Sequence, residues 1–200
     1  PEGAEDIYKS GDLKKLNLKE LEIEETAIEE LRYDKLPESI EKIYARGCKN
    51  LTNYDLKNLN KLKKLCIGRT AIKELTYDKL PETIEEIYAR GCKNLTYYNL
   101  KNLNKLKILG IGKTAIEELR YDKLPESIEK IYASWCKNLK KCSLKNLKNL
   151  KKLDIAYSGI KKLDPEDLPE SLETLVVSID QDVSEIEKDP RFKNLEIKVI

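Results

Sequence analysis

The segment Gly110-Ile111-Gly112-Lys113-Thr114 resembles the end of a phosphate-binding loop. Such loops read G-x-x-x-x-G-K-[ST], because backbone amides of the loop surround the phosphates and the lysine reaches them. The first glycine of that pattern would stand at residue 107, which is a lysine here, and residues 109 to 111 belong to an apolar strand pattern. The sequence therefore predicts neither a nucleotide site nor a bound cofactor.

Histidine is absent from all 200 residues. Neither a Ser-His-Asp triad nor a Cys-His pair can be assembled without it. Carboxylates are numerous, but they recur with the repeat described below, which is typical of solvated, charge-paired surfaces rather than of an acid–base pair. We therefore expect no catalytic residues and a protein that is not an enzyme.

Three of the five cysteines, Cys48, Cys92 and Cys136, are spaced 44 residues apart. In a stack of 22-residue repeats this spacing is two strands, or about 9.6 Å at about 4.8 Å per strand. Disulfides need Cα atoms within roughly 7 Å, and one tetrahedral zinc ion could not bridge such a gap. The sequence predicts reduced, buried thiols, no metal and a reducing compartment such as the cytoplasm. Cys66 lies outside this set and is expected to face solvent and react faster.

One apolar pattern of 22 residues, L-x-x-L-x-[LIAV]-x-x-[TCS], runs along the chain without an insertion. Its eight starts are Leu18, Ile40, Leu62, Ile84, Leu106, Ile128, Leu150 and Leu172. A period of 20 to 29 residues with one short strand per repeat is typical of leucine-rich repeats. The sequence thus predicts an α/β solenoid: a leucine-rich repeat arc whose concave side is a parallel β-sheet of about nine strands, with short helical, 3₁₀ or extended convex segments.

We expect a single domain over residues 1–200. Residues 1–17 form an N-terminal cap with Ile7, Tyr8, Leu13 and Leu16, residues 18–179 form the eight repeats, and residues 180–200 form a C-terminal cap with a last strand. The chain begins with Pro1 and contains no methionine, which indicates a processed chain or a fragment.

Repeats of two kinds alternate, and they predict different convex segments. Where the pattern ends in cysteine, the apolar spacing of residues 95–106 predicts a short helical or 3₁₀ turn. Where it ends in threonine, the proline in residues 119–128 predicts an extended or tightly turned path. Small donors at the ninth position should bond backbone carbonyls in a buried ladder: Thr26, Cys48, Thr70, Cys92, Thr114, Cys136, Ser158 and Asp180.

Side chains alternate along a strand, so the register also predicts which residues point outward on the concave face. Tyrosine, tryptophan and arginine supply most interface hot spots, and Trp135 replaces the glycines found in the equivalent positions 47 and 91. Its neighbour in the next strand should be Tyr157. The candidate partner-binding residues are Tyr44, Arg46, Tyr88, Arg90, Tyr132, Trp135, Asp154 and Tyr157. An alternative is that the tyrosines merely fill the sheet and were copied by duplication.

The segment LPESIEKIYARGCKNL, residues 36–51, resembles repeats of plant immune receptors, and the ending T-A-I-x-E-L is similar to other repeats of those receptors. The pattern L-P-x-x-[IL]-x-x-[IL] also resembles the repeats of bacterial effectors delivered into host cells. That resemblance implies recognition of a host protein, a location in the host cytoplasm after secretion, and sometimes a separate ubiquitin-ligase domain. No such catalytic domain is visible in this sequence.

Charge and hydropathy narrow the choice of partners. Lys plus Arg number 38 against 36 Asp plus Glu, so the overall charge gives no drive toward nucleic acid or an anionic membrane. No apolar stretch is long enough to span a bilayer. We expect a monomeric, non-enzymatic module that binds a protein partner on its concave face, as the target-binding part of a larger effector or receptor. The alternatives are a nucleic-acid-binding surface and a structural or engineered scaffold without a natural ligand.

Overall fold

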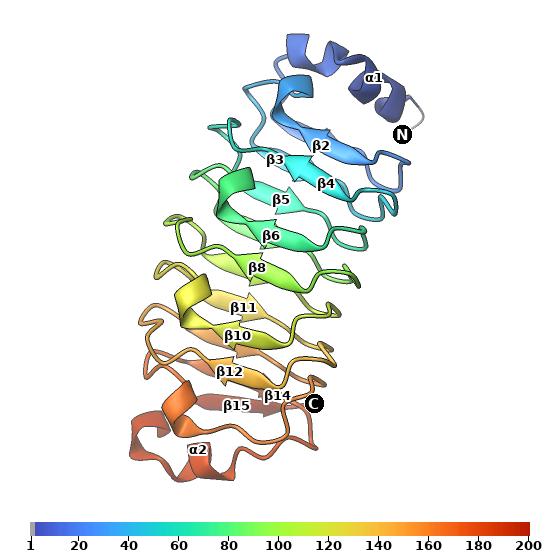
Figure 1. The fold of residues 1–200 in the computed structure, drawn as a ribbon. Helices are drawn as coiled ribbons and strands as arrows, with labels where there is room; N and C mark the ends of the chain where they lie inside the picture. The colour runs from blue at the N-terminus through green and yellow to red at the C-terminus, as the bar shows by residue number, and fades with distance from the viewer. Residues whose placement is uncertain (1–2) are drawn as a thin grey trace.

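Nine short parallel strands form one long sheet along the chain. The computed structural model describes residues 3–200, and Figure 1 shows the coils stacked into an elongated body. In order along the sheet, the strands are β1 (Glu20–Glu22), β3 (Lys42–Tyr44), β5 (Lys64–Cys66), β7 (Glu86–Tyr88), β9 (Ile108–Gly110), β11 (Lys130–Tyr132), β13 (Lys152–Asp154), β14 (Thr174–Val177) and β15 (Glu196–Val199). The predicted leucine-rich repeat solenoid with nine parallel strands is confirmed.

The register of this sheet equals the sequence period. Leu21 pairs with Ile43, and every following strand is offset by 22 residues, up to Leu175 opposite Ile197. Side chains of this central row are buried from β1 to β14, while their neighbours within each strand face away from the core. One residue of slip would place the charged neighbours in the core, so the apolar pattern holds the register.

The other side of the stack carries three two-stranded parallel sheets, drawn in front in Figure 1. The pairs are β2 (Glu30–Arg32) with β4 (Asn53–Asp55), β6 (Glu74–Thr76) with β8 (Tyr97–Asn99), and β10 (Glu118–Arg120) with β12 (Lys141–Ser143). Three-residue 3₁₀ helices follow the first strand of each pair: η2 (Tyr33–Lys35), η3 (Tyr77–Lys79) and η4 (Tyr121–Lys123). We call this the short-strand side.

The convex segments therefore differ from the prediction for the two repeat types. The helical or 3₁₀ turn expected in residues 95–106 is wrong, because Tyr97–Asn99 is a strand and turns follow it. The 3₁₀ helix lies instead in the threonine-type repeat, within residues 119–128. The apolar spacing of 95–106 fits either path, and tyrosine favours extended backbone where a neighbouring strand offers hydrogen bonds.

A tyrosine hydroxyl links the strands of adjacent repeats on the short-strand side. Tyr98 is buried, and its hydroxyl donates to the Glu118 carbonyl at 3.1 Å and accepts from the Arg120 amide at 2.8 Å. One unit earlier, Tyr54 makes the same two bonds, to the Glu74 carbonyl and from the Thr76 amide. These bonds satisfy backbone groups that a two-stranded sheet leaves unpaired.

The N-terminal helix α1 (Ala4–Ser10) supplies the same link for the first repeat. Tyr8 is buried, and its hydroxyl donates to the Glu30 carbonyl at 2.9 Å and accepts from the Arg32 amide at 2.9 Å. Leu13 of η1 (Asp12–Lys15) is also buried, whereas Ile7 and Leu16, which we expected to cover the core, are exposed. Residues 1 and 2 of the expected cap lie outside the described residues.

At the C-terminal end, short helices lie beside the last strands. They are η5 (Pro165–Asp167), α2 (Ser184–Lys188) and η6 (Pro190–Phe192). Ile186 and Phe192 point into the core from α2 and η6. They cover the side of the last coil that would otherwise meet solvent.

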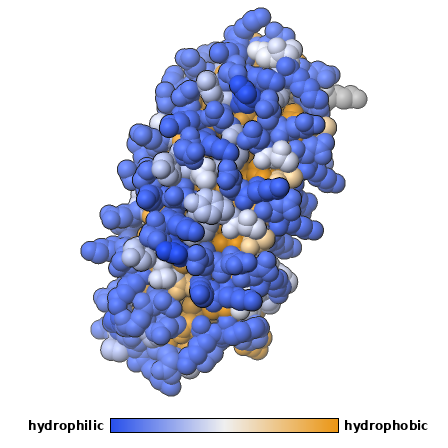
Figure 2. Space-filling model, in the orientation of Figure 1, coloured by the Kyte–Doolittle hydropathy of each residue, from blue (hydrophilic) through white to orange (hydrophobic). Residues whose placement is uncertain are grey.

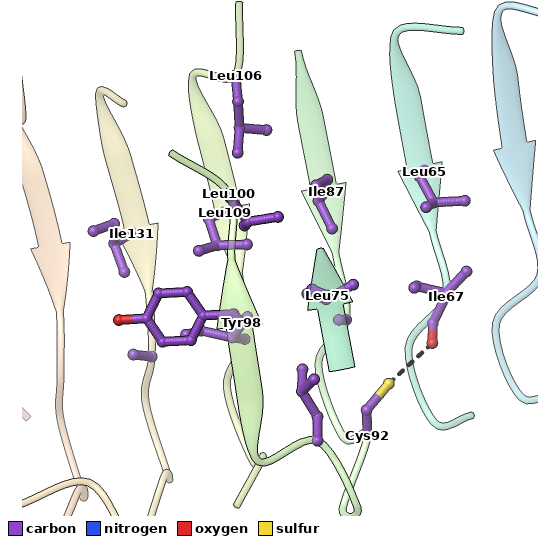
Figure 3. Packing of buried hydrophobic residues seen from close by; sticks show 14 of the residues in the cluster. Leu65, Ile67, Leu75, Ile87, Cys92, Tyr98, Leu100, Leu106, Leu109 and Ile131 are labelled. Carbon is purple, nitrogen blue, oxygen red and sulfur yellow. Dashed lines mark hydrogen bonds between the residues drawn. The ribbon is translucent and has the colours of Figure 1, made fainter. Parts of the chain in front are cut away.

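A continuous apolar core separates the long sheet from the short-strand side. Figure 3 shows Leu65, Ile87 and Leu109 from successive strands of the long sheet, facing Leu75 and Tyr98 from the short-strand side. These five side chains are at most 2% exposed. Because every repeat buries its apolar row against its neighbours, folding of one repeat depends on the next.

The ladder of small donors forms at the corners after the long-sheet strands β1 to β11. Thr70 donates its hydroxyl hydrogen to the Ile67 carbonyl at 2.8 Å. Cys92 of the next repeat donates to the same carbonyl at 3.1 Å, the bond drawn in Figure 3. The pairs Thr26 with Cys48 and Thr114 with Cys136 repeat this contact. All five cysteines are unpaired, and Cys48, Cys92 and Cys136 are buried as predicted.

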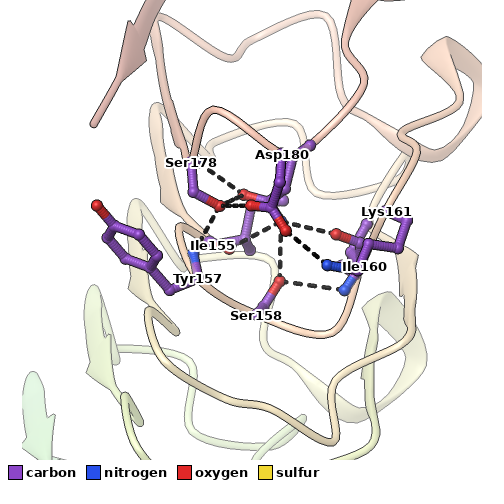
Figure 4. Close-up of polar contacts among 8 residues, drawn as sticks. Ile155, Tyr157, Ser158, Ile160, Lys161, Ser178 and Asp180 are labelled. Carbon is purple, nitrogen blue, oxygen red and sulfur yellow. Dashed lines mark hydrogen bonds and ion pairs between the residues drawn. The ribbon is translucent and has the colours of Figure 1, made fainter.

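Two predicted ladder residues depart from the pattern: the Ser158 hydroxyl accepts from the Ile160 amide at 3.4 Å and from Gln181 at 3.1 Å, and Asp180 is misplaced. Its exposed carboxylate accepts from Lys161 at 2.6 Å and from the Ser178 hydroxyl at 2.7 Å, as Figure 4 shows. Buried Gln181 takes the ladder position, and its amide donates to the carbonyls of Ile155 at 3.1 Å and Ile160 at 2.9 Å. The ladder needs hydrogen-bond donors, and an ionised carboxylate has none.

Candidate functional site

The outward side of the long sheet, together with the corner residues that follow each strand, is called the sheet face. Seven of these corner residues, each directly before a ladder residue, adopt the left-handed conformation with φ between 55° and 81°. Two are Gly47 and Gly91, and the others are Glu25, Arg69, Lys113, Trp135 and Tyr157. Glycine adopts this conformation without strain, whereas bulky residues there are uncommon and cost of order 1–3 kcal/mol. Gly47 and Gly91 are the sequence signal for this turn, although the alternation of side chains predicted ordinary strand at these positions.

Trp135 and Tyr157 stack on adjacent corners of the sheet face. Their ring centroids are 4.4 Å apart at an interplanar angle of 27°, so the predicted adjacency is confirmed. The ammonium groups of Lys113 and Lys137 lie 5.5 Å and 5.1 Å from the centroid of the Trp135 ring. Trp135 is 41% exposed, and Ile179 at the next corner is 88% exposed. These three corner side chains form an apolar strip, which we call the aromatic ridge.

A second feature of the sheet face is a hollow of about 370 Å³ above β5. Cys66 and Gly68 lie at its centre, and Tyr44 and Tyr88 stand on the two neighbouring strands. Three arginines and a lysine surround it: Arg46, Arg69, Arg90 and Lys113. We call this the central hollow.

Glycines shape the sheet face because neighbouring side chains and backbone need their space. A Cβ atom at Gly68 would lie 2.7 Å from the Arg90 carbonyl oxygen, so the floor of the central hollow cannot carry a side chain. Gly110 lies beneath the Tyr88 ring and Gly112 beneath the Arg90 guanidinium. Packing thus accounts for the glycines of the loop-like segment 110–114, because Tyr88 and Arg90 fill the space beside Gly110 and Gly112.

The charged groups around Tyr88, those of Glu86 and Lys64, form an ion pair with each other. Its hydroxyl donates to the Glu86 carboxylate at 3.1 Å, and the Lys64 ammonium lies 3.2 Å from that carboxylate and 5.1 Å from the Tyr88 ring centroid. Burial, followed by the hydrogen bond and charge of Glu86, raises the pKa of Tyr88 to about 12. Tyr88 therefore stays neutral at physiological pH and forms a fixed wall of the central hollow.

Arginine pairing distinguishes the central hollow from the rest of the molecule. Elsewhere, Arg32, Arg120 and Arg191 each contact a carboxylate within 4 Å. Within residues 3–200, no carboxylate lies that close to Arg46, Arg69 or Arg90. Arg90 donates to the Ser134 hydroxyl at 3.1 Å. The sheet face therefore holds the three arginines that the fold leaves free of ion pairs in the described part of the chain.

The eight candidate residues fall into three groups. Tyr44, Arg46, Tyr88 and Arg90 line the central hollow, and Trp135 and Tyr157 belong to the aromatic ridge. Tyr132 and Asp154 lie between them, at the ends of β11 and β13. The candidate set omitted the six other lining residues of the hollow: Glu24, Cys66, Gly68, Arg69, Gly91 and Lys113. The repeat register could have identified these residues, because it places them on the outward side of the long sheet or at its corners.

Asp154 is half-buried, and its carboxylate is partly used by the protein itself. Its Oδ1 accepts a hydrogen bond from the Ala156 amide at 3.1 Å. Burial outweighs this bond and raises the pKa of the carboxyl above its ordinary value. The Asp154 side chain is therefore less available to a partner than the unpaired arginines.

Another hollow, of about 650 Å³, lies on the short-strand side. It is lined by carboxylates and ammonium groups together, including Glu118 and Lys123, which are 3.8 Å apart. Figure 2, in the orientation of Figure 1, shows a predominantly hydrophilic surface crossed by narrow apolar strips. Self-paired charges make this hollow a weaker candidate than the smaller one on the sheet face.

Two other kinds of feature are missing from residues 3–200. The helices of this segment are too short and too polar for any to cross a lipid bilayer. No cluster of three or more cysteine, aspartate or glutamate side chains in this range is arranged to hold a metal ion.

Solved structures with the same fold include two bacterial leucine-rich repeat proteins. The leucine-rich effector protein YopM from Yersinia pestis is 25% identical over 70% of this chain and 43% of its own, with a TM-score of 0.51. YopM from Yersinia enterocolitica is 21% identical over 82% of this chain and 39% of its own, with a TM-score of 0.47. The functional domain of InlJ from Listeria monocytogenes is described as including a cysteine ladder. It is 13% identical over 92% of this chain and 53% of its own, with a TM-score of 0.49.

This chain spans about half, or less, of the length of each of these proteins. No protein-family model matches the sequence, and no curated protein matches it. The comparison therefore identifies the fold of the chain.

Proposed function

We propose that this chain, a leucine-rich repeat solenoid, is a non-enzymatic recognition module that binds a protein partner on its sheet face, with the aromatic ridge as the main contact. The observation that carries the proposal is Trp135, an exposed aromatic residue in a backbone conformation that favours glycine. Two equivalent corners retain glycine, so folding does not require an aromatic side chain there. Interaction with a partner supplies a reason for a strained and exposed tryptophan.

The ridge has the composition and arrangement of an interface anchor. Trp135 and Tyr157 are fixed against each other at 4.4 Å, which reduces the entropy lost on binding. Lys113 and Lys137 flank the tryptophan ring and give the apolar centre a polar border. An apolar anchor with a polar rim is typical of protein–protein interfaces.

The wider role rests on the fold and on the resemblance of its repeats. We propose that the chain acts as a monomer and as the target-binding part of a larger effector or receptor. A cytoplasmic location, including the cytoplasm of a host cell after secretion, suits its five unpaired thiols. The Yersinia pestis protein is described as an effector, and because the two proteins share the fold, this description supports the proposed role as part of an effector.

Substitution of Trp135 by glycine tests the proposed binding surface. A partner isolated with the wild-type protein should bind the Trp135→Gly variant at least about thirtyfold more weakly, because truncation of such an anchor costs about 2 kcal/mol or more. Titration calorimetry with the purified partner measures the change. The variant should retain its thermal stability, because glycine occupies the equivalent corners 47 and 91.

Tyr121→Ala provides a matched control on the short-strand side. Tyr121 is 43% exposed, close to the 41% of Trp135, but it lies outside the sheet face. Its replacement should leave partner affinity unchanged. Equal affinity of the Trp135→Gly and wild-type proteins would exclude the aromatic ridge as the main contact.

A further inference from the structure

Among residues 3–200, the arginines of the central hollow lack carboxylate partners within 4 Å, which indicates that a ligand there would be negatively charged. Arg46, Arg69, Arg90 and Lys113 border the hollow, and Glu24 is its single carboxylate. Four cations and one carboxylate leave an excess of three positive charges around about 370 Å³. Elsewhere in the described chain, each arginine has a carboxylate within 4 Å. The repeat thus leaves positive charge uncompensated at one place.

The shape of the hollow concentrates this charge. Tyr44 and Tyr88 stand on strands two positions apart, and only Cys66 and Gly68 lie between them at the floor. Gly68 has to remain without a side chain because of the Arg90 carbonyl, so the opening is a fixed feature of the repeat. Charges beside a concave, partly apolar wall act in a lower effective dielectric than charges on a flat surface.

From this geometry we propose that the central hollow binds a phosphorylated side chain of the protein partner. This inference rests on the proposed recognition function and adds the chemistry of the partner. A phosphate monoester carries a charge of about −1.5 to −2 and three strong acceptor oxygens at neutral pH, whereas a carboxylate carries one charge and two oxygens. Several arginine forks meeting at one hollow match the phosphate group better.

A protein partner fits the surrounding surface better than a nucleic acid does. Nucleic acids present a phosphate on every nucleotide and require a basic track along the surface. Here the cations meet at one hollow, and the neighbouring first strand places Glu20, Glu22 and Glu25 on or beside the sheet face. The whole chain carries a formal net charge of only +2. Repulsion by the first strand would oppose binding of a continuous polyanion.

Two residues provide built-in readouts of this site. Cys66 lies at the floor of the hollow and is partly exposed, whereas the other four cysteines are buried. A bound group should therefore slow the reaction of Cys66 with a thiol reagent. Lys113 borders the hollow and lies 5.5 Å from the ring of Trp135, the single tryptophan of the chain. Recruitment of Lys113 by an anion should change the tryptophan fluorescence.

The test uses the full chain and small probes of defined charge. Phenyl phosphate, a phosphoserine tripeptide and a phosphotyrosine tripeptide are compared with benzoate, a triglutamate peptide and a twelve-nucleotide single-stranded DNA. Phosphate monoesters should slow labelling of Cys66 at least about tenfold at saturation and should change Trp135 fluorescence with the same midpoint. The two phosphopeptides distinguish an aliphatic from an aromatic phosphate ester.

Arg69→Gly is the decisive variant. It removes one cation at a corner where glycine is the unstrained residue, so the fold should be retained. Loss of a charge-assisted bond should weaken phosphopeptide binding at least about tenfold. Arg120→Gln, on the short-strand side and paired with Asp122, is the control and should bind like the wild type.

Several outcomes would overturn the proposal. Equal protection of Cys66 by triglutamate would replace phosphate with carboxylate as the ligand, and tighter binding of the oligonucleotide would indicate a nucleic-acid surface. Protection that survives in Arg69→Gly, or no protection by any phosphate ester, would also exclude it. In Trp135→Gly, phosphate should still protect Cys66 even though the partner is lost. The two proposals can therefore fail separately.

Discussion

Arginine and tyrosine occur on both sides of the stack, and they make different contacts on each. On the short-strand side, Arg120 contacts two carboxylates, and the Tyr98 hydroxyl links two backbone groups of the next repeat. On the sheet face, Arg46 and Arg69 have no carboxylate within 4 Å among the described residues, and Tyr132 contacts the Lys152 ammonium through its ring. Polar groups on the short-strand side hold the repeats together, whereas those on the sheet face remain available.

The corner residues sharpen the same comparison. On the buried side of the corner, Thr70 and Cys92 both donate to the Ile67 carbonyl, so their hydrogen-bonding groups are already used within the fold. Outside it, Trp135 and Arg69 stand in a left-handed turn that glycine would fill with less strain. Residues that the fold does not need, placed where they cost stability, are the ones to test for function.

Thiol labelling should reveal the largest difference between the two regions. Cys66 should react at least about a hundredfold faster than Cys48, Cys92 and Cys136, because buried thiols react only after local opening that costs several kcal/mol. Burial raises the pKa of Cys66 and slows it relative to a free thiol, but it remains accessible. Mass spectrometry of peptides after timed labelling measures each rate. Rapid modification of all three corner cysteines in the native protein would contradict their structural role.

Removal of one hydroxyl should have unequal effects on the two sides. Tyr98→Phe leaves the Glu118 carbonyl and the Arg120 amide without their partner, which should lower the free energy of unfolding by about 2 kcal/mol. Tyr132→Phe on the sheet face should change it by less than about 0.5 kcal/mol. Urea denaturation compares both variants with the wild type. Similar losses in the two would mean that sheet-face tyrosines are as structural as the linking ones.

The smallest expected effect is a pH dependence at Asp154. Because burial raises the pKa of this carboxyl, the folded state binds its proton more readily than the unfolded state. The resulting stability is fully present below the ordinary pKa and is lost as the pH rises through the raised value. Asp154→Asn keeps an oxygen for the Ala156 amide and should unfold at a higher temperature than the wild type at neutral pH.

Thermal unfolding from acid to neutral pH checks this assignment. The difference between wild type and Asp154→Asn should grow as the pH rises and should be smallest in acid. A constant difference across this range would show that the Asp154 carboxyl is not perturbed by burial.

The repeat sequence determined the long sheet, because the apolar residues at 22-residue spacing can all be buried in only one register. It also determined the buried corner donors and the adjacency of Trp135 and Tyr157, since both follow directly from that register. Two resemblances of pattern were misleading. Residues 95–106 have apolar spacing that suits a turn of helix, and Asp180 has the ladder position by counting but lacks a donor.

Tertiary structure alone decided which polar groups remain free. The 3₁₀ helix η4 places Asp122, two residues further along the chain, against the Arg120 guanidinium, whereas in residues 3–200 no coil places a carboxylate within 4 Å of Arg69. The left-handed turn at Trp135 and the open floor at Gly68 likewise depend on how adjacent coils approach each other. Periodicity determines the position of a residue along the stack. Its partners depend on distances between coils, which the sequence specifies only through packing of the whole stack.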